Sequence, residues 1–192
     1  MHRWEKMDIL RYTDLVAIPW KNGGGVTREI ARHDRDGQLV WRLSIADVVS
    51  EGPFSAFPGL QRILTVIEGE GMVLERPDRT AIAATRFDPI AFSGDDAING
   101  LLPHGPCRDF NVIWNAVLAK ASVTFVHGPQ ETPNLADDEI LGVLCLRGPV
   151  QLPDGQALSP FDFAFPDAHG SSARMEDDSM ALLICIKPIS KS

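Results

Sequence analysis

The sequence predicts an all-β protein, and two observations carry this prediction. The 192 residues include 16 glycines and 14 prolines, which are spread along the whole chain and leave few stretches long enough for an uninterrupted helix. Between them lie short runs rich in β-branched and aromatic side chains, which is the pattern of a β-sandwich or β-barrel. Hydrophobic residues make up 44% of the chain, which is enough for one ordinary domain or two small β modules.

The expected strands are the β-rich runs between turn residues. In the first part of the chain they are Asp8–Tyr12, Val26–His33, Leu39–Val48, Arg62–Ile67, Gly71–Glu75, Pro89–Phe92, Ala97–Leu101 and Asp109–Trp114. In the second part they are Ser122–His127, Ile140–Leu146, Phe161–Phe165 and Ala181–Lys187. Ile67–Met72 is expected to form a hairpin turn in which glycine supplies positive φ. Ala116–Ala121 alone has a helical tendency, and we expect it to link two halves.

The order of elements is repeated within the chain. Each half has an apolar strand, a glycine turn, a strand that begins with proline and ends in Ala-Phe, an acidic turn and a closing apolar strand. The proline strands are Phe87–Asp95 and Ser159–Asp167. Repetition of this kind indicates duplicated modules. We therefore predict a bicupin, two stacked cupin-like β-barrels or sandwiches of the RmlC-like jelly-roll type. Residues 1–118 would form an N-terminal cupin with a ligand pocket, and residues 119–192 a smaller, supporting C-terminal cupin.

The net charge of −8 bears on the kind of partner. An acidic surface repels phosphate backbones and anionic lipids, and the basic residues are scattered, so we expect neither nucleic acid nor a membrane as partner. A small anionic ligand is still compatible, because a local arginine pocket can outweigh the global field. The N-terminus lacks an apolar stretch of signal-peptide length, and no apolar run approaches the ~20 residues of a membrane helix. The expected location is the cytoplasm.

Polar side chains alternate with apolar ones on neighbouring expected strands. Thr27 and Glu29 share one face of their strand, and Arg42 and Ser44 share one face of the next. In an open sheet such faces meet water, whereas in a barrel one face lines the lumen and needs hydrogen-bond partners or a ligand. These residues are therefore either solvated or the polar wall of a pocket. Asp109 and Asn111 form a third stripe of the same kind.

Two loops border these strands. Asn22 precedes three consecutive glycines, which allow the backbone to approach another group closely and to present free N–H donors. The alternative is a sharp chain crossing over a barrel mouth. A loop held by Pro53 and Pro58 leads to Arg62, whose planar guanidinium suits a carboxylate. The alternative for Arg62 is a surface salt bridge. His104 lies on a turn before the Asp109 strand and could contact a ligand.

The sequence offers no conventional catalytic or metal motif. The histidines are dispersed, without the His-x-His pair, nearby glutamate and later histidine of metal-dependent cupins. No Gly-x-Ser-x-Gly elbow is present, and no cysteine has an evident base partner. We therefore expect no catalytic residue, no metal and no cofactor.

Several motifs in register resemble the HutD/Ves family. They are the Asn-Gly-Gly-Gly-x-Thr-x-Glu pattern from Asn22 to Glu29, Trp41–Ala46, Gly52–Gly59 with Arg62, Phe92–Asp95 and Asp109–Asn111. The similarity covers nearly the whole chain and is strongest before Asn115. One departure is that a Met and an Arg are expected after Asn111, where this chain has Val112–Asn115. Ligand preference could differ accordingly.

The resemblance implies a two-cupin fold without an established enzymatic activity. Members of the family occur in bacterial histidine-utilisation operons and are thought to moderate the pathway by sensing urocanate or another pathway acid, such as a formylglutamate-like metabolite. The implied pocket lies in the N-terminal cupin and is lined by Asn22, Thr27, Glu29, Arg42, Ser44, Arg62, Asp109 and Asn111. A homodimer is compatible with this assignment.

Three functions are compatible with these observations. The leading one is a metabolite-binding regulatory protein in which Arg62, with Arg42, holds a carboxylate and Glu29 accepts an imidazole N–H. The second is a metal-free isomerase or hydrolase of a small acid, with Glu29 or Asp109 as general base and His104 as acid. The third is a protein–protein interaction module with a vestigial pocket.

Overall fold

Strands dominate the structure, a computed structural model that describes residues 9–133, 139–166 and 172–189. Its described helical part is one 3-10 turn, η1 (Tyr12–Asp14), so the all-β prediction is confirmed. The chain divides into two compact units. We call Val16–Ala119 the N-terminal unit. The described residues up to Leu15 and those from Lys120 onward form the C-terminal unit.

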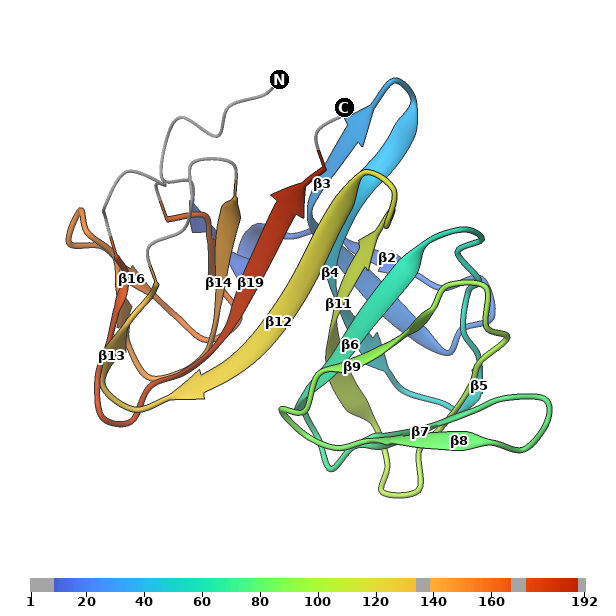
Figure 1. Ribbon diagram of the computed structural model, residues 1–192. Coiled ribbons are helices and arrows are strands. Elements are labelled where there is room, and N and C mark those ends of the chain that lie inside the picture. Colours follow the sequence, from blue (N-terminus) through green and yellow to red (C-terminus); the bar gives the residue numbers. More distant parts are fainter. Residues whose placement is uncertain (1–8, 134–138, 167–171, 190–192) are drawn as a thin grey trace. The chain divides into compact units, whose positions relative to one another are not determined.

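The N-terminal unit contains two sheets (Figure 1). The six-stranded sheet has the order β2 (Ala17–Pro19), β3 (Gly25–Arg35), β4 (Gln38–Val48), β11 (Cys107–Trp114), β6 (Gln61–Glu68) and β9 (Ile90–Ser93). The four-stranded sheet has the order β5 (Gly52–Pro53), β10 (Asn99–Leu101), β7 (Met72–Glu75) and β8 (Ala81–Ala84).

The C-terminal unit also contains two sheets. The five-stranded sheet has the order β1 (Ile9–Leu10), β17 (Phe163–Ala164), β14 (Ile140–Arg147), β19 (Met180–Pro188) and β12 (Ala119–His127). The four-stranded sheet has the order β13 (Gln130–Glu131), β18 (Arg174–Met175), β15 (Val150–Gln151) and β16 (Ala157–Leu158).

The two units repeat one strand order. The order β4-β11-β6-β9 recurs as β12-β19-β14-β17, and β5-β10-β7-β8 recurs as β13-β18-β15-β16. The repetition read in the sequence therefore corresponds to a repeated topology. The N-terminal unit adds β2 and β3 beside β4, and the C-terminal unit adds β1 beside β17. This last pairing, Ile9 with Ala164 and Leu10 with Phe163, assigns the first described residues to the C-terminal unit, whereas we had expected them in the N-terminal cupin.

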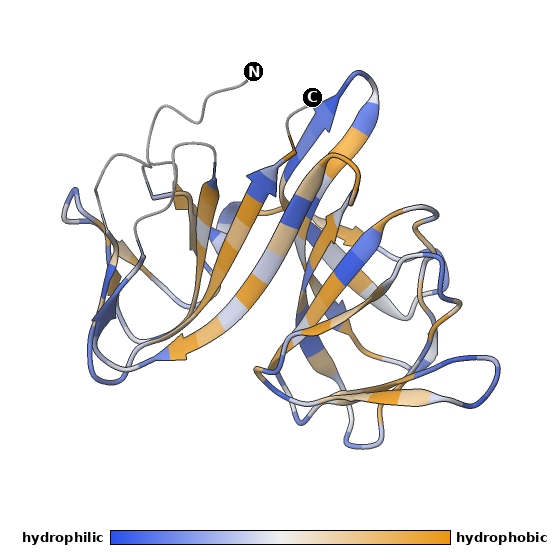
Figure 2. Ribbon diagram, in the orientation of Figure 1, coloured by the Kyte–Doolittle hydropathy of each residue, from blue (hydrophilic) through white to orange (hydrophobic). Residues whose placement is uncertain are grey.

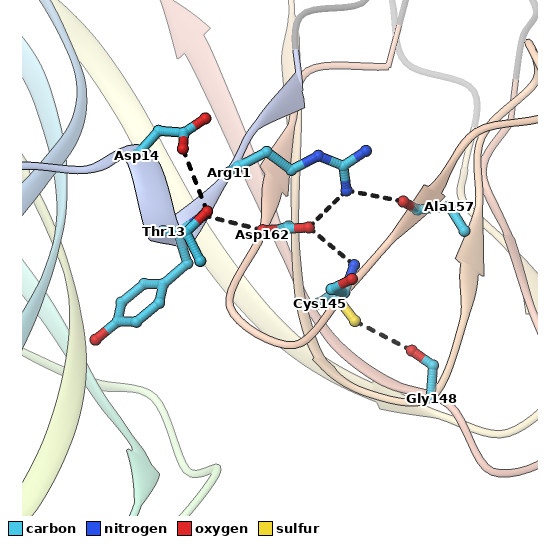
Figure 3. A network of polar contacts seen from close by, with 9 residues as sticks. Arg11, Thr13, Asp14, Cys145, Gly148, Ala157 and Asp162 are labelled. Carbon is cyan, nitrogen blue, oxygen red and sulfur yellow. Dashed lines mark hydrogen bonds and ion pairs between the residues drawn. The ribbon is translucent and has the colours of Figure 1, made fainter.

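The chain segment before β2 is held to its unit by a buried carboxylate. Asp162 accepts hydrogen bonds from the Arg11 guanidinium at 2.7 Å, from the Tyr12 backbone N–H at 2.9 Å and from the Ser159 backbone N–H at 2.9 Å. Figure 3 shows the Arg11 side chain reaching both Asp162 and the carbonyl of Ala157. The carboxylate thus anchors the segment that contains β1.

Each unit has its own apolar core. In the C-terminal unit the core includes Leu141, Val143, Cys145 and Ala181, and Figure 2 shows β14 and β19 as mainly hydrophobic. In the N-terminal unit, apolar side chains of β6, β7, β8 and β9 form a cluster with Val48 and Cys107. This cluster fills only part of the space beside the six-stranded sheet, and polar side chains line the rest.

Two expectations about local structure were wrong. Ile67–Met72 is not a hairpin turn, because β6 pairs with β11 and β9 whereas β7 pairs with β10 and β8 in the other sheet. Its glycines do have positive φ, 91° at Gly69 and 115° at Gly71. Ala116–Ala121 does not form a helix, because the single turn in which the N–H groups of Leu118 and Ala119 bond to the carbonyl of Asn115 is followed directly by β12, which begins at Ala119. Of the expected strand Asp8–Tyr12, Asp8 lies outside the described residues.

Candidate functional site

A cavity of about 620 Å³ opens beside the six-stranded sheet of the N-terminal unit. Its walls come from β2, β3, β4, β6 and β11, from the turn after β2 and from the loop after β5. The lining residues are Ile18, Pro19, Trp20, Lys21, Asn22, Thr27, Arg42, Ser44, Ala46, Pro53, Phe54, Ser55, Phe57, Arg62, Asp109, Asn111 and Ile113. This size suits a small metabolite.

Strand register brings the polar residues together. Ile113 of β11 stands between Arg42 of β4 and Arg62 of β6, as its direct partner in both ladders. Two residues earlier, Asn111 pairs with Ser44, which in turn pairs with Glu29 of β3. Because side chains two residues apart share one face of a strand, these stripes all face the cavity side of the sheet.

Arg62 lies at the inner end of the cavity and is almost fully buried. Its Nη2 donates to Asn111 Oδ1 at 2.9 Å and its Nη1 to the carbonyl of Ser55 at 3.4 Å. Its guanidinium carbon lies 4.8 Å from the ring centroid of Phe92 and 5.2 Å from that of Phe57, so aromatic faces stabilise the cation. Burial lowers the pKa of Arg62 to about 10, although nearby Asp109 raises it, and the side chain remains charged at neutral pH.

Asp109 is the other buried charged group. The residue is 1% exposed, its Oδ1 accepts a hydrogen bond from Asn111 Nδ2, and its Oδ2 has no partner within the part of the chain that the structure describes. Burial raises the pKa of Asp109 to about 7, and this effect exceeds the opposing effects of the Arg62 charge and the Asn111 hydrogen bond. A carboxyl group that titrates near neutrality therefore lines the cavity.

Arg42 supplies the more accessible cation. Its Nε donates to Glu29 Oε2 at 2.6 Å, and its side chain is 20% exposed. Among the described residues it makes no other hydrogen bond, so its two terminal nitrogens are available to a ligand. Glu29 does not line the cavity, because the ion pair turns its carboxylate to Arg42.

The rim is formed by the turn that contains the three glycines. The N–H of Gly23 bonds to the carbonyl of Trp20, and that of Gly24 bonds to Asn22 Oδ1 at 3.0 Å. The expectation of free N–H donors is therefore wrong for these two glycines. The turn instead places Trp20 and Asn22 at the mouth, where Trp20 Nε1 donates to Thr27 Oγ1 at 2.7 Å.

The structure brings together most of the residues named from the sequence. Those that line the cavity are Asn22, Thr27, Arg42, Ser44, Arg62, Asp109 and Asn111. Glu29 does not line the cavity but forms an ion pair with Arg42, which does. His104 is exposed on the turn after β10, which a hydrogen bond from the N–H of Gly105 to the carbonyl of Leu102 closes, and it does not line the cavity.

Sequence reasoning missed the apolar wall. Trp20 and Phe54 pack edge to face with ring centroids 5.9 Å apart, and Phe57 and Ile18 complete this side. The aromatic residues between Pro53 and Pro58 were not among the site residues expected from the sequence. Lys21, also at the mouth, was not considered, although its charge beside two arginines would have indicated a site for an anion.

The C-terminal unit has apolar residues at the matching positions. Both ladders contain one irregularity at the same place, between Arg108 and Asp109 in β11–β6 and between Cys145 and Arg147 in β19–β14. Counting from it aligns Asp109 with Ala181, Asn111 with Leu183 and Arg62 with Leu141. These three apolar residues belong to, or pack against, the core cluster of the C-terminal unit. The repeated fold therefore does not require the buried Asp-Asn-Arg set.

A second hollow, of about 940 Å³, lies in the C-terminal unit. Its charged lining consists of Arg174 and the carboxylates of Glu131, Glu176, Asp177 and Asp178. This balance of charge disfavours an anion. Within the described ranges, no group of three or more His, Cys, Asp or Glu side chains is placed to hold a metal ion. The described residues also contain no helix long and apolar enough to cross a membrane.

Comparison with known proteins adds independent information. A family model described as HutD matches residues 12–183. A Pseudomonas putida protein described as an uncharacterized 21.2 kDa protein in the hutC 3′ region is 38% identical over 138 residues, 71% of this chain and 73% of that protein. The structure of HutD from Pseudomonas fluorescens SBW25 (formate condition) is 34% identical, with a TM-score of 0.83 over 96% of this chain and 100% of that one.

More distant structures share the fold alone. The bacterial pirin YhhW of Escherichia coli, in complex with nickel(II), is 9% identical, with a TM-score of 0.68 over 96% of this chain and 100% of that one. With the repeated strand order described above, these likenesses confirm the predicted cupin-like β fold.

Proposed function

This chain belongs to the HutD family, and on that premise we propose that its N-terminal unit binds a small carboxylate, urocanate being the leading ligand, and thereby moderates histidine utilisation. The observation that carries the proposal is the cavity in which two arginines and a lysine meet aromatic walls. A planar carboxylate with an unsaturated body would suit both surfaces.

The two arginines would have different tasks. Arg62 is enclosed by aromatic rings and by Asn111, and it sets a positive potential at the inner end of the cavity. Arg42 has unengaged terminal nitrogens and would make the direct bidentate contact. Buried Ser44 stands beside Arg42 on the same face and would add a hydrogen bond.

The other end of the ligand would meet Trp20, Phe54 and Thr27 at the mouth. The imidazole acceptor first assigned to Glu29 fits less well, because that carboxylate already pairs with Arg42. A ligand N–H would instead find the Thr27 hydroxyl, which accepts a hydrogen bond from Trp20 and has acceptor capacity left.

The enzyme hypothesis named Glu29 or Asp109 as base and His104 as acid. The structure does not assemble that set, because His104 lies on an exposed turn and Glu29 faces Arg42. Long incubation of urocanate with the protein tests the hypothesis, since a binding protein returns the compound unchanged.

Calorimetric titration with urocanate tests the proposal, with N-formylglutamate and histidine as comparison ligands. We expect saturable binding of urocanate and a loss of about 1.5–3 kcal/mol of binding free energy in Arg62→Ala, because the ligand carboxylate loses the buried positive charge at the inner end of the cavity; this magnitude equals the usual worth of a hydrogen bond to a charged group. Arg62→Lys should lose less binding free energy than Arg62→Ala, because lysine keeps the positive charge and lacks only the planar guanidinium.

The matched control for this titration is Arg76→Ala. Arg76 is a half-buried arginine of the same unit that pairs with Asp96 and does not line the cavity. Its removal should leave urocanate affinity unchanged. Equal affinities of the wild-type protein and Arg62→Ala would refute the role of Arg62, and an absence of heat with all three compounds would remove the histidine-pathway ligand.

A further inference from the structure

Three side chains form a continuous polar chain at the inner end of the cavity. Arg62 Nη2 donates to Asn111 Oδ1 at 2.9 Å, and Asn111 Nδ2 donates to Asp109 Oδ1. The amide of Asn111 is thus oriented from both ends, with its oxygen to the cation and its nitrogen to the carboxylate. The electrostatic state of Asp109 is thereby linked to that of Arg62.

These three hydrogen-bonded side chains are buried, but not all of their polar atoms have a hydrogen-bond partner. Asp109 Oδ2 and Arg62 Nε have no hydrogen-bond partner among the described residues. An ionised carboxylate with an unpaired oxygen is costly in a buried site, and a proton on that oxygen removes the charge. Burial accordingly raises the pKa of Asp109 to about 7, against the opposing influence of Arg62 and Asn111.

The charges around Asp109 come from every neighbouring strand. On the cavity side they are Arg62 of β6, Arg42 of β4, its ion-pair partner Glu29 of β3 and Lys21 of the turn after β2. On the other side of the sheet Arg108, Asp47, Arg28 and Glu68 form an ion-pair network, in which Asp47 further raises the pKa of Asp109. Burial raises the pKa of the Cys107 thiol, on the same strand, to about 12, so the thiol stays protonated near neutrality.

We propose that Asp109 takes up a proton from solvent when a carboxylate binds at the Arg42–Arg62 end of the cavity, so that the site binds its anion together with a proton. This inference rests on the proposed function only in requiring that the cavity accept a carboxylate. Without the proton, the ligand and Asp109 would place two negative charges beside the one buried guanidinium of Arg62. In a site of low dielectric constant that repulsion is large, and protonation of Asp109 Oδ2 removes it.

The direction of the pH dependence follows. Below pH 7 Asp109 is already protonated in the free protein, so the affinity for the anion is constant. Above pH 7 each binding event must bring a proton from solvent, so the affinity falls about tenfold per pH unit until the higher pKa of the complex is reached. The cavity would therefore respond to acidity as well as to metabolite concentration.

Formate, the smallest carboxylate, provides a test that does not depend on the natural ligand. The carboxyl ¹³C shift of Asp109 is followed against pH in chloride and in formate at equal ionic strength. We expect a midpoint near 7 in chloride and a midpoint higher by about one unit or more in formate. The same midpoint in both salts overturns the proposal, as does a midpoint in the ordinary aspartate range in chloride.

Two variants complete the experiment. In Asp109→Asn formate affinity should be the same one unit below and one unit above pH 7, because the amide keeps an acceptor for Asn111 but cannot titrate. Asp96→Asn, which removes a carboxylate paired with Arg76 outside the cavity, should keep the wild-type pH dependence. A pH dependence that persists in Asp109→Asn would assign the coupling elsewhere and overturn the proposal.

The two proposals fail in different ways. If urocanate gives no heat while formate raises the Asp109 midpoint, the proposed ligand is wrong and the proton coupling stands. If urocanate binds with equal affinity on both sides of pH 7, the coupling is wrong and the binding function stands.

Discussion

The carbonyl oxygen of Asp47 lies 2.3 Å from the position that a Cβ at residue 25 would occupy. Gly25 begins β3, pairs with Val48 of β4 and accepts a hydrogen bond from the N–H of Trp20. A glycine is needed here for close approach of two backbones. Gly23, two residues earlier, has a φ of 71° and no atom near its Cβ position, so it is needed for its backbone angle.

These different causes predict different costs. We expect Gly25→Ala to lower the free energy of unfolding by about 2–3 kcal/mol, because the Asp47 carbonyl must move. Gly23→Ala should lose about 1 kcal/mol, the cost of a left-handed conformation for a residue with a Cβ. Urea denaturation of both variants checks the difference. Equal losses would mean that the strands separate at little cost.

At the scale of residues, alternation was a sound guide to orientation and a poor one to partners. It placed Thr27, Arg42 and Ser44 on the cavity face, because the two-residue period of a strand does not depend on its neighbours. It did not reveal that Glu29 is engaged by Arg42. Alternation also could not show that His104 lies outside the cavity. The partner of Glu29 and the position of the His104 turn both depend on segments distant in the sequence.

At the scale of elements, the β6–β11 ladder and the β14–β19 ladder are two versions of one structure. They share the place of their irregularity, and β6 and β14 share one burial pattern over eight residues. Where one has Arg62, Asn111 and Asp109, the other has apolar side chains. A buried charged set is seldom better for stability than well-packed hydrophobic residues of similar size.

The comparison predicts the outcome of a swap within the molecule. The triple variant Arg62→Leu, Asn111→Leu and Asp109→Ala copies the C-terminal unit into the N-terminal one. We expect its free energy of unfolding to equal or exceed that of the wild-type protein, by up to about 1–4 kcal/mol, because no polar group of the set is left buried and unpaired. Carboxylate binding should be lost. Urea denaturation and formate titration check both parts.

The single variant Arg62→Leu is the matched control. It leaves Asn111 and Asp109 buried without their cation and should be clearly less stable than the triple variant. A triple variant that fails to fold would instead show that the polar set supports the structure of the N-terminal unit, although its repeat in the C-terminal unit folds without one.

The limits of prediction at this scale come from non-local pairing. The long strands β3, β4, β6 and β11 were predicted, because each is a long β-rich run. The short strands β2 and β8 were missed, since a few residues of exposed or mixed character carry no periodic signal. Ile67–Met72 was taken for a hairpin because the glycines are local, whereas the choice of sheet for the next strand is not.

At the scale of the whole chain, duplication was visible as an order of elements. The order strand, glycine turn, proline strand and closing strand survives in both halves where individual residues do not. What the order could not show is that β1, the first strand among the described residues, pairs with β17. Among its described residues the N-terminal unit has no strand at the position of β1, so this pairing could not be predicted from the repeated order of elements.

Asp162 makes this pairing testable. Its carboxylate accepts from the side chain of Arg11 (Figure 3) and from the backbone N–H groups of Tyr12 and Ser159, and nearby Ile9 packs against the apolar core of the C-terminal unit. Removing a buried acceptor leaves its donors unpaired, at about 1–3 kcal/mol for each group. We therefore expect Asp162→Ala to lower the free energy of unfolding by about 3 kcal/mol or more.

Hydrogen exchange locates the effect of that variant. The N–H groups of β1, β14 and β17 should exchange faster, whereas formate binding in the cavity of the N-terminal unit should persist under conditions where the variant remains folded. Asp154→Ala is the control, because Asp154 bonds only within its own exposed turn, to Gln156, and should cost less than about 1 kcal/mol. Equal destabilisation by the two variants would mean that β1 contributes little to the C-terminal unit. A large loss confined to Asp162→Ala would establish that β1 and the segment after it complete the C-terminal unit.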